Sequence, residues 1–155
     1  MIEKKVNEEY INKINWKMSI IAGIMGTILF DVVGFLITGI WWDIPSLLGA
    51  KTGLGFAYGL GGHFSNGILL AILYAGISSS LWGPNWLKVL LFVTVQTIAL
   101  VWLFMLPLLG AGVAGLNMDP MMPLITLARH WAYAIPLIFL LNQVTNTTDK
   151  SAEKL

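Results

Sequence analysis

The chain is organised around residues 18–40, which read MSIIAGIMGTILFDVVGFLITGI and contain a single charged side chain, Asp31. At a rise of about 1.5 Å per residue, a helix of this length crosses a hydrocarbon core of roughly 30 Å. The run is longer than the apolar core of a secretory signal peptide, and no small-residue cleavage site stands out. We therefore expect it to be a retained membrane-spanning helix.

Three further apolar segments follow, at about 55–80, 87–109 and 120–143. A GPN turn at 83–85 and the glycine-rich stretch GAGVAGLNMD at 110–119 separate them. Because backbone groups in lipid must be satisfied within a segment, each of these segments is expected to be helical. The sequence thus predicts an all-α protein, an integral membrane four-helix bundle at 18–143. A polar, amphipathic tail at 1–17 and a polar tail at 144–155 flank it.

The composition supports this class and excludes others. Hydrophobic residues make up 57% of the chain and charged residues 11%, whereas roughly a quarter of a soluble domain is charged. A net charge of +1 with a single arginine argues against nucleic acid as a partner. The chain has no cysteine, which excludes disulfides, thiolate-bound zinc and iron–sulfur clusters.

The distribution of lysine predicts the orientation. Positive charge concentrates on the cytoplasmic side of membrane proteins. Here it lies in the two tails and beside the GPN turn at 83–85: Lys4, Lys5, Lys13, Lys17, Lys88, Lys150 and Lys154. The opposite side carries Lys51. We expect a multi-pass protein of the cell inner (cytoplasmic) membrane with both termini in the cytoplasm.

The two outer connections share a motif in which aspartate precedes proline. Asp43 is followed by Pro45, and Asp119 by Pro120. Aspartate at an N-cap with proline in the first turn typically begins a helix. We predict that Asp119 caps the fourth span and that Asp43 caps a short interfacial helix ending near Gly49. A histidine in both the second and fourth spans then suggests two related helical hairpins.

Four ionisable side chains fall at one depth in the outer half of the membrane. Measured from the outer end of each span, Asp31 lies roughly 13 Å deep, His63 roughly 12 Å and His130 roughly 15 Å, with Arg129 one residue shallower. Small residues spaced four apart around His63, at Gly59, Gly67 and Ala71, direct it into the bundle. The predicted site consists of these four residues, the polar Asn66 and the indole of the third span: Asp31, His63, Asn66, Trp102, Arg129 and His130.

Several uses of this polar layer remain open. It could be a purely structural network that fixes the helix register. His63 and His130 could ligate a b-type haem, and with Asp31 they could hold a divalent metal such as copper, zinc or iron. A quinone, a lipid headgroup or another small anion could bind Arg129 and the histidines. A proton or substrate path is a further alternative.

Five motifs resemble a known family: GxxGT at 23–27, GHFSNG at 62–67, YAG at 74–76, PLLGAGVAGL at 107–116 and RHWAY at 129–133. They are similar to a family of small four-helix prokaryotic membrane proteins of unknown function, the DUF6789-like group. The resemblance implies the four-span fold and marks His63 and His130 as characteristic positions. It implies no activity.

The chain is small, has no catalytic signature and carries many small-residue helix faces. We therefore predict an accessory or ligand-binding subunit of a larger membrane complex, of respiratory or monooxygenase type. Its partners would be the lipid bilayer and either other membrane subunits or further copies of the chain. The rival hypotheses are a redox or metal protein that uses the two histidines and a small transporter or proton path.

Overall fold

The computed structural model describes residues 14–152, with side chains up to Leu141. In this part of the chain four helices are long and apolar enough to cross a membrane: Trp16–Thr38, Gly55–Ser80, Asn85–Leu108 and Met122–Leu141. The described residues form helices and turns without a strand. The all-α, four-helix architecture predicted from the sequence is thereby confirmed. The predicted tail at 1–17 lies almost wholly outside the described residues.

Helix α2 (Trp16–Thr38) is bounded by local caps, not by hydropathy. The side chain of Asn15 accepts a hydrogen bond from the Met18 amide at 3.0 Å. At the other end Gly39 adopts the left-handed conformation, with a φ of 73°, and its amide donates to the Phe35 carbonyl. The helix therefore begins and ends two residues before the predicted span of 18–40.

The first outer connection contains helix α3 (Asp43–Thr52), which leads into α4 (Gly55–Ile77) and the short 3₁₀ turn η1 (Ser78–Ser80). Two predictions here were wrong. Trp42, not Asp43, occupies the N-cap of α3, and the helix continues past Gly49 to Thr52. Asp43 is the first residue of α3, and its carboxylate has a distant partner described below.

The third span is not a uniform α-helix. It consists of α5 (Asn85–Gln96), the π-helix η2 (Thr97–Met105) and the single turn α6 (Leu106–Leu108). A π-helix bonds each residue to the fifth along the chain, and such segments frequently mark functional sites. Hydropathy predicted the length of this span but cannot distinguish the two hydrogen-bonding patterns.

The second outer connection contains only the short 3₁₀ turn η3 (Val113–Gly115) before α7 (Met122–Ala152). The side chain of Asp119 accepts a hydrogen bond from the Met121 amide at 2.7 Å, as an aspartate at a helix start does. Helix α7 continues beyond residue 143, so 144–152 of the predicted tail are helical. The two outer connections thus differ, a ten-residue helix in one and a three-residue turn in the other.

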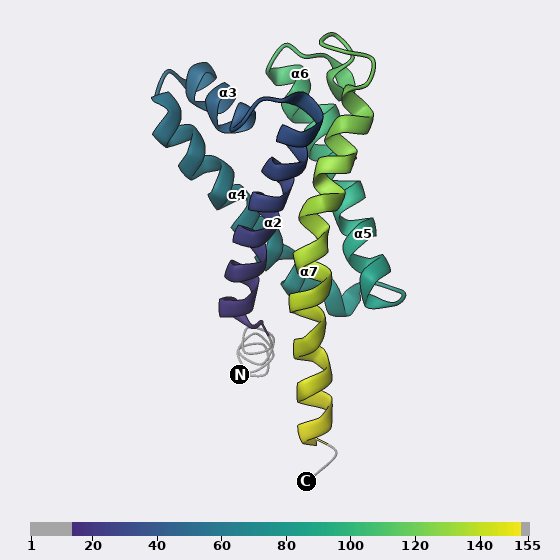
Figure 1. Ribbon diagram of the computed structural model, residues 1–155. Coiled ribbons are helices and arrows are strands. Elements are labelled where there is room, and N and C mark those ends of the chain that lie inside the picture. Colours follow the sequence, from purple (N-terminus) through teal and green to yellow (C-terminus); the bar gives the residue numbers. More distant parts are fainter. Residues whose placement is uncertain (1–13, 153–155) are drawn as a thin grey trace, which may run out of the picture.

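The helices form an open arrangement. Helix α2 packs against both α4 and α7, α5 packs against α7, and α3 packs on α4. Helices α4 and α5 meet at the turn near Gly83 and then diverge, so that α4 and α3 stand apart from η2 at the other end (Figure 1). Helix α2 begins and α7 ends at the same end of the molecule (Figure 1).

Helices α2, α4 and α7 cross closely at a group of glycines. A Cβ atom on Gly23 would lie 2.6 Å from the Cα atom of Ile68 on α4. The hydroxyl of Tyr133 on α7 donates to the carbonyl of Gly67 on α4 at 2.6 Å. This crossing fixes the register of the three helices. Toward α3, His63 lies one turn from Gly67 on α4, and Asp31 lies about two turns from Gly23 on α2.

Candidate functional site

Asp31 and His63 face each other across the α2–α4 interface. The Nε2 atom of His63 lies 3.1 Å from Oδ1 and 3.2 Å from Oδ2 of Asp31, whose side chain is almost completely buried. A carboxylate can only accept, so Nε2 of His63 is the donor. The structure therefore brings together two of the predicted site residues in a carboxylate–imidazole pair.

Arg129 joins this pair, but its main partner is Asp43. The Nη1 and Nη2 atoms of Arg129 lie 2.6 and 2.7 Å from the two carboxylate oxygens of Asp43, a bidentate ion pair. The distance from Nη2 to Oδ1 of Asp31 is longer, 3.7 Å. Asp43 was expected to cap a helix, and its contact with Arg129 was not predicted. The sequence did contain a signal for this contact, because a lone arginine inside a membrane needs a carboxylate as its partner.

The guanidinium of Arg129 lies in a seat formed by α2. A Cβ atom on Gly34 would lie 2.6 Å from Nε of Arg129, so only glycine leaves room at this position. The ring of Phe30 lies 4.3 Å from Cζ, a cation–π distance. Gly34 and Phe30 are thus two site residues that sequence reasoning missed, because neither carries a reactive group.

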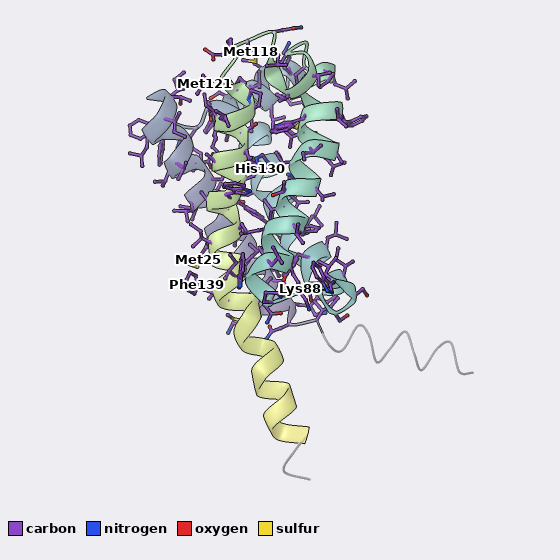
Figure 2. All side chains as sticks on the ribbon, turned by 90° about the vertical axis from the view of Figure 1, so that its right-hand side faces the viewer. Met25, Lys88, Met118, Met121, His130 and Phe139 are labelled. Atoms are coloured by element: carbon purple, nitrogen blue, oxygen red, sulfur yellow. The ribbon has the colours of Figure 1, made fainter. Side chains whose placement is uncertain are left out.

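His130 stands apart from the ionic network. Its Nδ1 atom lies 2.6 Å from the carbonyl oxygen of Thr126 on the preceding turn of α7. Its ring packs edge-on against Phe30, with centroids 5.0 Å apart, and the ring of His63 packs against Phe30 at 5.4 Å. His130 is half-buried, and Figure 2 shows it at a level between Met121 and Phe139. The two imidazoles therefore share one aromatic neighbour.

A cavity of about 420 Å³ lies between α4 and η2, where the two helices diverge. Its wall is mostly apolar. Gly62 and Asn66 on α4 and Leu100 on η2 are exposed, so the cavity opens at the side of the bundle. The polar or charged side chains that line it come from five elements: Thr27, Thr52, Tyr58, His63, Asn66, Gln96, Thr126, Arg129, His130 and Tyr133.

Some of these polar groups have no partner in the protein. The amides of Asn66 and Gln96 make no hydrogen bond to any described residue, and both line the cavity. Trp102, by contrast, donates from Nε1 to Oγ1 of Thr126 at 2.8 Å and packs against a separate apolar cluster. Four of the six predicted site residues line the cavity: His63, Asn66, Arg129 and His130. Trp102 and the buried Asp31 do not.

The described residues contain no group of three or more His, Asp or Glu side chains placed to hold a metal ion. The predicted ligand set of His63, His130 and Asp31 is therefore not assembled. Asp31 is engaged by His63 and Arg129, and His130 is held by its own helix.

No protein-family model matches the chain, and neither the curated proteins nor the solved structures include a significant match. The resemblance to the DUF6789-like group stays a prediction.

Proposed function

We propose that this protein is a four-span inner-membrane protein, with both termini in the cytoplasm, that binds a neutral lipid-soluble molecule in its lateral cavity. The observation that carries the proposal is the cavity itself, about 420 Å³ in volume. Small-molecule pockets of roughly 300–1,000 Å³ are typically apolar with a few placed polar groups. This cavity has that composition.

The charges favour a neutral ligand over an anion. Arg129 is the one cationic side chain that lines the cavity, and its guanidinium already forms a bidentate pair with Asp43 and faces Asp31. Two carboxylates therefore offset one guanidinium, and no uncompensated positive charge remains for a phosphate or carboxylate ligand. Among the ligands open from the sequence, a quinone-class molecule fits better than a lipid headgroup or a small anion.

The position of the cavity favours entry from the bilayer. It lies between two helices that are long and apolar enough to span a membrane, and its mouth is on the side of the bundle. A molecule dissolved in the lipid would reach it without crossing water. The π-helix η2 forms one wall, in keeping with the association of such segments with functional sites.

The outer part of α4 supports a role within a larger assembly. Gly61 and Ser65 are exposed four residues apart on this helix and do not line the cavity, and small residues at this spacing are typical of helix–helix interfaces in membranes. We infer that the chain acts as an accessory, ligand-binding subunit of a respiratory or monooxygenase-type complex. Native electrophoresis in mild detergent should show a larger assembly, and a free monomer alone would contradict this part.

Ligand binding is tested with the purified chain in lipid nanodiscs, titrated with a short-chain benzoquinone and its reduced form. We expect saturable binding that Asn66→Trp weakens about tenfold or more, because the indole would fill a cavity that buries most of a ligand. Ser65→Trp, on the neighbouring exposed position, is the matched control and should leave affinity unchanged. Absence of saturable binding by the unmodified chain would contradict the proposal.

One observation favours a second candidate, a haem b or metal protein. Nδ1 of His130 donates to a backbone carbonyl, which is how many ligating histidines are oriented, and this leaves Nε2 free. A Soret band or stoichiometric metal that His130→Ala and His63→Ala abolish would establish this function. A colourless, metal-free preparation that still binds the quinone-class probe would exclude it.

A further inference from the structure

The two imidazoles of the cavity are each fixed in one tautomer. Nε2 of His63 donates to the Asp31 carboxylate, and Nδ1 of His130 donates to the Thr126 carbonyl. Both partners are oxygens that can only accept. In the neutral form of each ring the remaining nitrogen, Nδ1 of His63 or Nε2 of His130, therefore carries a lone pair and no proton.

Both remaining nitrogens are available to a ligand. Neither makes a hydrogen bond to a described residue, and the one buried side-chain nitrogen or oxygen without a partner among those residues is Nε of Arg129. The free nitrogens of His63 and His130 are thus not sealed inside the protein. Both side chains line the cavity and both rings contact Phe30, so the two imidazoles lie against one aromatic ring in the cavity wall.

The other polar groups of the cavity do not discriminate in the same way. The amides of Asn66 and Gln96 can turn to present either their oxygen or their NH₂ group, so they suit donors and acceptors alike. A neutral imidazole cannot change role without losing the bond to Asp31 or to Thr126. In their neutral form the two imidazoles therefore offer two fixed acceptors. The fixed donors of Arg129 are directed at Asp43 and Asp31 or, for Nε, buried in the protein.

Resting on the proposed function, we infer that the cavity selects a ligand with two hydroxyl donors, the chemistry of a hydroquinone, over the oxidised quinone. A hydroquinone directs an O–H group at each imidazole nitrogen. A quinone directs only carbonyl oxygens at them, and leaves both nitrogens and both carbonyls unpaired. The rings of Phe30, Tyr58 and Tyr133 in the wall suit a planar aromatic ligand.

Three matched probes test this with the full chain in nanodiscs under anaerobic, reducing or non-reducing conditions: an alkyl hydroquinone, the corresponding quinone and the hydroquinone dimethyl ether. We expect the hydroquinone to bind about tenfold or more tightly than either of the others, since each lost hydrogen bond leaves a polar atom unpaired. Equal affinity for the quinone or the ether would overturn the inference and leave the proposed function intact. No binding of any probe would overturn both.

A variant shows whether the histidine acts through hydrogen bonding or only through packing. His130→Leu should reduce affinity for the hydroquinone while leaving affinity for the quinone and the ether nearly unchanged, so that the preference falls toward parity. An equal loss for all three probes would indicate a packing role and contradict the inference. Phe139→Leu, on the exposed face of α7, is the control and should preserve the preference.

A monoglyceride, which also offers two hydroxyls, should bind more weakly than the hydroquinone, and tighter binding would overturn the aromatic assignment.

Discussion

The guanidinium of Arg129 lies between two carboxylates and over an aromatic ring. Three partners therefore stabilise its charge, whereas a simple ion pair inside a membrane would supply one. Depth and small-residue spacing predicted that Asp31, His63 and Arg129 would lie near one another, and the structure brings them together. Those patterns could not reveal Asp43, because its partner is 86 positions away and its place before a proline also suits a helix cap. They could not reveal Gly34 either, since its contribution is the absence of a side chain.

Asp43 and Asp119 look alike in sequence but differ in their contacts, and substitution should separate them. Asp43→Asn removes the charge that faces Arg129, so we expect a loss of about 1–3 kcal/mol in the free energy of unfolding. Asp119→Asn should change it by about 0.5 kcal/mol or less, because asparagine caps a helix as well as aspartate does. Unfolding in mixed micelles with increasing denaturing detergent measures both. Equal losses for the two variants would mean that the Asp43–Arg129 pair contributes little.

At the scale of elements, α3 forms part of the cavity wall and depends on glycine for its position. Ile44, Leu48 and Thr52 of α3 line the cavity. Gly59 of α4 lies directly under α3, where a Cβ atom would be 2.7 Å from the Gly49 amide nitrogen and closer still to the Pro45 carbonyl oxygen. The predicted small-residue row of α4 is therefore a packing surface, but at Gly59 its partner is α3 and not another span.

Replacing a glycine inside a helix with alanine usually increases the free energy of unfolding. At Gly59 this contact predicts the opposite effect. Gly59→Ala should push α3 away from α4 and cost about 1–3 kcal/mol, since backbone atoms of α3 would have to move. Gly61→Ala, where a Cβ atom would meet nothing within 4 Å, should be neutral or stabilising by about 0.5–1 kcal/mol.

The movement of α3 can be measured through a thiol, because the chain has no cysteine. In a Leu48→Cys background, Gly59→Ala should speed maleimide labelling several-fold, whereas Gly61→Ala should leave the rate unchanged. Equal rates in the two glycine variants would show that α3 is not held by this contact.

At the scale of the whole molecule, the number and approximate limits of the spans were predictable because the length of an apolar run is a property of composition. The cavity was not predictable in this way. It exists because α4 and α5 diverge beyond their turn, while the glycine crossing holds α4 on α2 (Figure 1). Neither the divergence nor the π-helix that faces it has a signature in hydropathy. The cavity can therefore be located only from the arrangement of the helices, although most of the polar residues of the site could be identified from the sequence.

The orientation in the membrane gives the last prediction. Helix α2 begins and α7 ends at one end of the molecule, and α4 runs toward that end, whereas α3 lies at the other (Figure 1). Ser79 belongs to η1, directly after α4, and Ser46 belongs to α3. Lysine placement predicts that the end with η1 lies in the cytoplasm. Both serines are exposed, so Ser46→Cys and Ser79→Cys form a matched pair of single thiols. In spheroplasts, whose inner membrane is intact, a membrane-impermeant maleimide should label the Ser46→Cys variant. It should label the Ser79→Cys variant only after the inner membrane is permeabilised. The opposite pattern would place both termini outside the cytoplasm and contradict the orientation included in the proposed function.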